Sequence, residues 1–258
     1  MKRTVKYALS IVLSMILVFS VFSVNTFAVQ DNYDKVISAI IDGCMVRKTK
    51  IDLREYKITL PQMKKIITKG LNNHPEVCLR GKYFTSQYTT DNNMVLILEI
   101  QYKYSKSKID KMQRKIDKKV NKILSKIKPN ASDYQKILYI HNYLAKHCKY
   151  DKSKKKANVR DIYGCLVKGK ALCKGYAQAF EYLLNKLKIK TYYVSSEEMN
   201  HGWNKVLLNG NWYNVDVTWD SINTRGKYNK VRRKYFLKSD EEFKKLKHYG
   251  GVCFYKVA

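Results

Sequence analysis

The sequence has six cysteines but no two of them in the Cys-x-x-Cys spacing typical of zinc sites. It also has no Gly-rich phosphate loop, nucleotide-binding fingerprint, internal repeat or low-complexity tract. His141, His147 and Cys148 are close in sequence, but they share a helical pattern in which core or surface positions are expected. We therefore expect no metal and no cofactor.

Acidic residues are scarce. The chain has 21 Asp and Glu against 51 Lys and Arg, a net charge of +30. Such a field attracts polyanions, and the excess of Lys over Arg favours diffuse attraction over bidentate reading of phosphates. The alternative is a lysine-rich surface without a specific partner. No nucleic-acid-binding module is recognisable, so no specific nucleic acid is expected.

Long apolar runs are absent except at the N-terminus. There, a basic start with Lys2, Arg3 and Lys6 precedes the 17-residue apolar stretch 8–24, and Ala28 closes a small-residue cleavage site. This order predicts a signal peptide over residues 1–28, and therefore a secreted or cell-surface protein. The alternative is an uncleaved anchor, for which 17 residues are at the short limit. After cleavage the charge is +27 and no transmembrane segment remains.

Three segments supply the groups of a cysteine nucleophile site. They are 169–177 with Cys173, 201–204 with His201, and 212–219 with Asp216. A thiol attacks acyl groups as its thiolate, so it needs a base that takes its proton and a carboxylate that fixes the imidazole tautomer. The order Cys, His, Asp provides all three.

These segments resemble the core of the transglutaminase-like superfamily, whose catalytic groups are arranged as in papain. The resemblance runs from about Ser132 to the C-terminus, and the most similar proteins are secreted bacterial ones. It implies that Cys173 is the nucleophile, His201 the base and Asp216 the orienting group. Outside a bacterial cell, the polyanions that the basic charge could attract are anionic cell-wall polymers, acidic lipids and nucleic acid. Gly202 stands where such proteins often have Ala, which should loosen the strand locally without removing a catalytic group.

The spacing around Cys173 predicts a helix. Apolar residues recur at helical intervals from Leu172 to Leu187, which puts Cys173 at the helix start. The partial positive charge there stabilises a thiolate, and the unpaired N–H groups can hold an oxyanion.

The other two groups fall on a predicted hairpin with its turn at Asn209-Gly210. Pairing outward from the turn sets Leu208 opposite Asn211, and His201 opposite Thr218. His201 then lies diagonal to Asp216 on the same face, within reach of an imidazole–carboxylate contact.

The remaining pattern predicts an α+β protein with a small N-terminal α+β region at 29–130 and a transglutaminase-like domain at 131–258. We expect a short amphipathic or strand segment at 33–44, a helix from Leu60 to 71, a strand at 94–104, and helices at 107–127 and 133–147. Ser239 and Glu242 form a capping box for a short helix through Lys247. His248 follows it, as a group behind the site or only a favourable charge at a helix end.

The sequence thus indicates an exported cysteine enzyme acting on peptide or protein amides through a thioester. Water as acceptor would make it a protease or amidase, and an amine would make it a cross-linking enzyme. The alternative is a catalytically inactive wall-binding or scaffold protein with a basic surface. If Cys173 is a thiol, five cysteines remain, so at least one more cannot pair within the chain.

Overall fold

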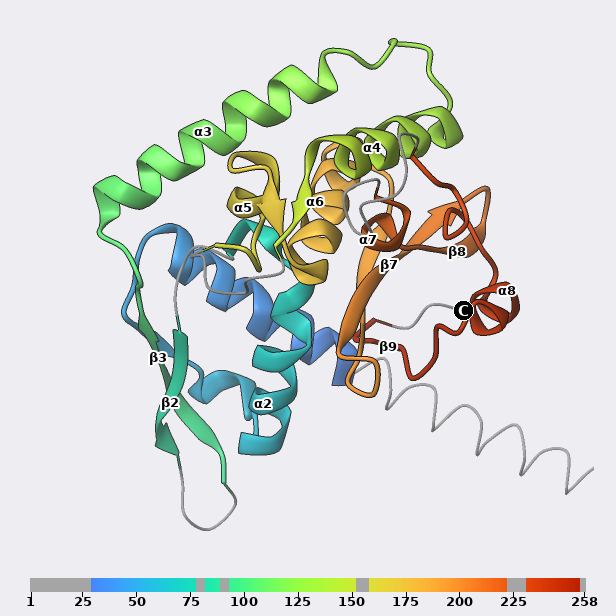
Figure 1. Ribbon diagram of the computed structural model, residues 1–258. Coiled ribbons are helices and arrows are strands. Elements are labelled where there is room, and N and C mark those ends of the chain that lie inside the picture. Colours follow the sequence, from blue (N-terminus) through green and yellow to red (C-terminus); the bar gives the residue numbers. More distant parts are fainter. Residues whose placement is uncertain (1–28, 78–81, 89–92, 152–157, 222–230, 256–258) are drawn as a thin grey trace, which may run out of the picture. The chain divides into compact units, whose positions relative to one another are not determined.

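The computed structural model describes residues 29–77, 82–88, 93–151, 158–221 and 231–255, with only the backbone of 82–88 (Figure 1). The predicted signal peptide lies outside these residues, as do the Lys-rich segment 152–156 and most of the basic segment 224–234. The chain divides into two compact units, Met1–Ile66 with Thr85–Glu99, and Ile67–Phe84 with Ile100–Ala258. No helix in the described ranges is long and apolar enough to cross a membrane.

The first unit combines two helices with a small sheet. A helix covers residues 29–45, where the sequence predicted a short amphipathic or strand segment, and it buries Val36, Ile37 and Ile40. Strand β1 (Lys50–Asp52) pairs antiparallel with β3 (Val95–Gln101), and the sheet order is β1-β3-β2, with β2 at Lys82–Tyr88. The 3₁₀ turn η1 spans Arg54–Tyr56, and helix α2 spans Leu60–Thr68.

The second unit contains most of the helices. Their bounds are η2 Gly70–Asn73, η3 Pro75–Val77, α3 Lys106–Leu124, α4 Asp133–His147, α5 Ile162–Leu166, α6 Cys173–Lys186, α7 Val217–Asp220 and α8 Asp240–Lys245. Helices α4 and α8 both begin with the capping boxes that their sequences encode, at Ser132 and Ser239. The apolar residues of α3 are buried on one side, and most of its charged residues are exposed.

A four-stranded antiparallel sheet completes the second unit, in the order β8-β7-β6-β9. Its strands are β6 Thr191–Ser196, β7 His201–Leu208, β8 Asn211–Val215 and β9 Val252–Cys253. A short parallel pair, β4 (Lys149–Tyr150) and β5 (Lys170–Ala171), leads into α6. Helix α6 packs against β7, as Figure 1 shows. The mixed helix-and-sheet class predicted from the sequence is confirmed.

The core of this unit lies between α6, its neighbouring helices and the sheet. Phe180 and Leu183 of α6 are fully buried in the same cluster as Val206 of β7 and Val215 of β8. Burying a side chain of this size contributes roughly 1.5–3 kcal/mol, so the interface fixes the helix on the sheet. This packing holds the start of α6, which carries Cys173, near the start of β7, which carries His201.

Candidate active site

Cys173 is the first residue of α6, as predicted. Leu172 occupies the N-cap position, and its apolar side chain cannot bond the first N–H groups of the helix. Such groups carry partial positive charge and are suited to an anionic ligand. The half-buried thiol of Cys173 therefore stands at a helix end that no side chain caps.

His201 opens strand β7, and the predicted hairpin register is confirmed over most of its length. Leu208 pairs with Asn211, and the ladder continues to Asn204 opposite Val215. The turn residues Asn209 and Gly210 have φ of 52° and 81°, the left-handed conformation that a two-residue hairpin turn requires. This turn sets the strand pairing that brings His201 near the end of β8.

The predicted pairing of His201 with Thr218 is wrong, because β8 ends at Val215 and the chain turns into α7. Asp216 is the N-cap of that helix, and its Oδ1 accepts the backbone N–H of Trp219 at 3.0 Å. A carboxylate that can satisfy a free N–H at a helix start favours the helix over further strand. The prediction from strand alternation considered only continued pairing of the strand, and did not include the competing helix start at Asp216.

Asp216 nevertheless meets His201, through a different backbone geometry from the one predicted. The Nε2 of His201 lies 2.7 Å from Oδ2 of Asp216, and the two side chains are only 7% and 1% exposed. With Nε2 engaged by the carboxylate, Nδ1 is the ring nitrogen left for the thiol of Cys173. The structure brings all three predicted residues together.

The ionisation of the three groups is linked. Burial alone would raise the pKa of the Cys173 thiol, but its hydrogen bond with His201, the charge of that ring and the backbone N–H of Gly202 bring it below its ordinary value. Burial alone would lower the pKa of His201, yet the charge and hydrogen bond of Asp216 raise it to about 10. A lowered thiol pKa together with a raised imidazole pKa favours a thiolate–imidazolium pair at neutral pH.

The carboxylate stays ionised inside the protein. Burial opposes this, but the charge of His201 and hydrogen bonds from His201 and His248 hold the pKa of Asp216 well below its ordinary value. The sequence left open whether His248 was a group behind the site or only a helix-end charge. In the structure its side chain is fully buried, with Nε2 2.9 Å from Oδ2 of Asp216.

His201, Asp216 and His248 also form a group with metal-ligand chemistry, since their ligand atoms lie within 4.8 Å of one another. The N···O distances of 2.7 and 2.9 Å are those of hydrogen bonds. A zinc ion would need N and O ligands at about 2.0–2.2 Å from itself, and would take Nε2 of His201 away from Asp216. The arrangement fits a hydrogen-bonded catalytic group better than a metal centre.

A second buried His–Asp pair joins α4 to α7. The Nε2 of His141 on α4 is 3.1 Å from Oδ2 of Asp220 at the end of α7, and both side chains are fully buried. Asp220 also accepts the backbone N–H groups of Lys234 and Tyr235. Of the core and surface positions expected for this segment, His141 takes a core one, and its partner Asp220 ties α4 to the segment after α7.

The comparisons with known proteins give a family match. Residues 120–217 match the model of the transglutaminase-like superfamily, and this range contains Cys173, His201 and Asp216. No curated protein matches the chain.

Several solved structures are distantly similar. One is described as a crystal structure of a TGase: 15% identity and a TM-score of 0.33, covering 72% of this chain and 54% of the other. Another, described as a candidate cysteine protease from Cytophaga hutchinsonii, has 15% identity and a TM-score of 0.33, with 56% and 62% covered. This chain thus spans about half to three fifths of the length of these proteins. Likenesses with such low TM-scores say nothing about the reaction.

Proposed function

We propose that this chain, whose residues 120–217 match the model of the transglutaminase-like superfamily, is a cysteine enzyme that transfers acyl groups from peptide or protein amides through a thioester on Cys173. The observation that carries the proposal is the position of His201 between the Cys173 thiol and the buried Asp216 carboxylate. A nucleophile, a base and an orienting group in contact are the requirements of this chemistry.

In the first step the Cys173 sulfur attacks the carbonyl carbon of the amide and forms a C–S bond. The C–N bond breaks, and the imidazolium of His201 gives its proton to the departing amine. The carbonyl oxygen carries negative charge in the transition state. The backbone N–H of Cys173, at the helix start that no side chain caps, is suited to stabilise it.

In the second step an acceptor attacks the thioester. His201 takes a proton from the acceptor, the C–S bond breaks, and the thiolate–imidazolium pair is restored. Water as acceptor gives a carboxylic acid, which is hydrolysis. A primary amine gives a new amide, which is cross-linking. The two outcomes use the same three residues and differ only in which acceptor reaches the thioester.

The test is to trap the acyl-enzyme. Purified protein is incubated with a bacterial wall extract, quenched in acid, digested and searched by mass spectrometry for an acyl group on the Cys173 peptide. We expect the adduct in the wild type, none in Cys173→Ala, and much less in His201→Ala. A biotinylated primary amine added to the reaction distinguishes the acceptors, because only a cross-linking enzyme incorporates it.

Failure of acylation, together with a Cys173 thiol no more reactive than an ordinary one, would favour the alternative class. The protein would then be an inactive wall-binding or scaffold protein. Thiol reactivity separates the two classes because a binding module needs no thiolate.

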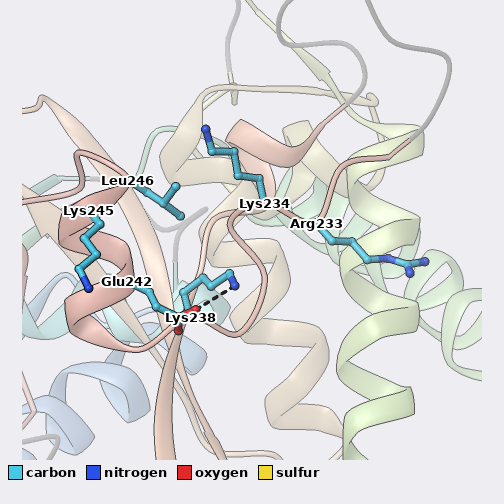
Figure 2. A pocket seen from close by; sticks show the side chains of 6 residues that line it. All are labelled: Arg233, Lys234, Lys238, Glu242, Lys245 and Leu246. Atoms are coloured by element: carbon cyan, nitrogen blue, oxygen red, sulfur yellow. Dashed lines mark hydrogen bonds and ion pairs between the residues drawn. The ribbon is translucent and has the colours of Figure 1, made fainter.

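Charge supports a separate proposal for the surface, binding to anionic wall polymers. Helix α3 exposes seven cations and one acid: Lys106, Lys108, Lys111, Arg114, Lys115, Lys118 and Lys122, against Asp117. A pocket of about 350 Å³ near α8 is also mostly cationic, lined by Arg233, Lys234, Lys238, Glu242, Lys245 and Leu246. Figure 2 shows its one acid, Glu242, already paired with Lys238.

A pull-down with purified walls across a salt series tests this partner. Exposed charges are screened as the Debye length falls from roughly 10 Å at 0.1 M to 3 Å at 1 M salt. We expect binding at low salt and release at high salt, and weaker binding when the α3 lysines are changed to Gln. Binding that high salt leaves unchanged would remove the electrostatic explanation.

Export is proposed from residues 1–28, which lie outside the described ranges. N-terminal sequencing of secreted protein should begin at Val29 if cleavage follows Ala28. Recovery of the Met1 terminus in the membrane fraction would show an anchor instead.

A further inference from the structure

His248 is a buried titratable group that the mechanism above does not use. It lies after α8, its side chain has no exposed surface, and its Nε2 is 2.9 Å from Oδ2 of Asp216. Because Asp216 is held as a carboxylate, it can only accept, so His248 must carry its proton on Nε2. The two residues are joined by an N–H···O⁻ hydrogen bond away from water.

The same carboxylate has two other donors. Oδ2 also accepts from His201 at 2.7 Å, and Oδ1 accepts the backbone N–H of Trp219 at 3.0 Å. The last torsion of an Asp side chain has broad minima, so its carboxylate turns easily unless its neighbours hold it. Without His248, the only donor to Oδ2 among the described residues would be His201, the residue that the carboxylate has to orient.

The surroundings of His248 do not otherwise explain an imidazole. Four aromatic rings enclose it, with centroids at 4.1 to 5.3 Å: those of Phe243, Trp219, Tyr235 and Trp203. Its Nδ1 has no hydrogen-bond partner among the described residues. A buried polar atom without a partner costs about 1–3 kcal/mol, which a phenyl ring in this apolar enclosure would avoid. The donor on Nε2 is what the imidazole adds.

We propose that His248 is a positioning residue of this active site. Its Nε2–H holds the Asp216 carboxylate so that Oδ2 faces His201, and the aromatic enclosure keeps the His248 ring in place. Through Asp216 it sustains the proton on His201, and through His201 the thiolate of Cys173. The proposal rests on the proposed function, because it assigns His248 to the same three residues.

The test compares variants that differ in where they present an N–H. The amide nitrogen of Gln can reach the place of Nε2, and that of Asn corresponds to Nδ1. We would measure the alkylation rate of Cys173 by iodoacetamide against pH, with site assignment by mass spectrometry, in the wild type, His248→Gln, His248→Asn and His248→Phe. Thermal unfolding of each variant is recorded alongside.

We expect His248→Asn and His248→Phe to move the acid limb of the profile toward higher pH. A rise of one unit in the apparent pKa of Cys173 lowers the thiolate fraction about tenfold at any pH well below it. His248→Gln should recover most of the loss. If His248 acted only through its packing, all three variants would have a changed melting temperature but an unmoved pH profile.

The matched control is His141→Gln, which alters the other fully buried His–Asp pair of the same unit and should leave the acid limb in place. A profile unchanged in His248→Asn and His248→Phe overturns the proposal, as does a limb that moves toward lower pH. If a variant does not fold, the Gln and Asn variants decide between them. A slow wild-type thiol would refute the proposed function itself, whereas a fast wild type slowed by His201→Ala but not by His248→Asn would refute only the positioning role.

Discussion

The ring of Tyr193 on β6 occupies the space that any side chain at Gly202 on β7 would need. A Cβ built on Gly202 would lie 2.3 Å from the Tyr193 hydroxyl oxygen, and 2.7 Å from two of its ring carbons. Strand β7 stays paired through this position, with Gly202 opposite Ser195. Because Gly202 follows His201 and its N–H faces the Cys173 sulfur, the packed ring fixes the backbone that supports the site.

The first prediction concerns this contact. Gly202→Ala forces either the strand or the Tyr193 ring to move, and overpacking of this kind costs typically about 1–3 kcal/mol. We expect a lower midpoint in urea unfolding, and slower alkylation of Cys173. The effect should be smaller when Tyr193→Ala is already present, and a double-mutant cycle measures that coupling. Full additivity of the two changes would show that the ring and the missing Cβ do not compete for space.

The second prediction is the pH profile of Cys173. Its pKa lies below the ordinary thiol value, and that of His201 is raised to about 10. Between these values the thiolate and imidazolium coexist, so alkylation should already be fast at neutral pH, below the ordinary thiol pKa of about 8.5. His201→Ala should remove this reactivity at neutral pH.

Two other cysteines serve as internal controls for that profile. Burial raises the pKa of Cys253 to about 11, and that of Cys165 also lies well above its usual value, mainly because of burial. Both should react slowly in the folded protein. Equal rates at Cys173 and Cys253 at neutral pH would contradict a working thiolate.

The third prediction is that Asp216→Asn separates catalysis from stability. The amide oxygen of Asn can still accept the Trp219 N–H and cap α7, but the charge that raises the pKa of His201 is gone. The pKa of His201 should fall and the thiolate should become rarer. We expect turnover to drop by about 10⁴-fold, as when the acid of a comparable triad becomes an amide, with a small change in the unfolding midpoint. Wild-type turnover in this variant would show that the carboxylate charge is not used.

The fourth prediction concerns the other buried pair. His141→Leu leaves the Asp220 carboxylate buried without its imidazole partner, and breaking a buried pair in this way costs about 3–5 kcal/mol. Guanidinium unfolding measures the loss. The exposed pair between Lys245 and Glu241 on α8 is the contrast, since Glu241→Gln should change stability by no more than about 0.5 kcal/mol. Similar losses of unfolding free energy in the two variants would mean that burial does not make the His141–Asp220 pair more important for stability.

Much of the fold could be predicted from local signals. The cap at Ser132, the capping box at Ser239 and the turn at Asn209-Gly210 each specify their own element, because the groups that bond one another are two to four residues apart. The start of α6 at Cys173 followed in the same way from the apolar spacing behind it. Such signals need no knowledge of the rest of the chain.

The features that the sequence did not predict depend on competition between two local structures, or on contacts between residues far apart in the chain. The alternating pattern predicts that Asp216 continues the strand. Its carboxylate instead accepts a backbone N–H at the start of α7, so the strand ends and His201 does not pair with Thr218. His248 carries no local mark of its role, because its partner lies 32 residues earlier and the rings around it come from four separate segments. Only the folded structure shows that His248 and His201 both donate to Oδ2 of Asp216.

The distances along the chain between these partners have a consequence for the order in which the site is assembled. His201 and Asp216 are 15 residues apart and joined by one hairpin, whereas His248 must return from 32 residues beyond Asp216. Contacts between near neighbours form early in folding, and those that close longer loops come later. The hairpin that joins His201 to Asp216 should therefore form while the Asp216 carboxylate still lacks the His248 donor. We expect the thiol to reach its full reactivity only when the segment around His248 has docked, so that the appearance of a fast-reacting Cys173 marks the end of folding rather than its beginning.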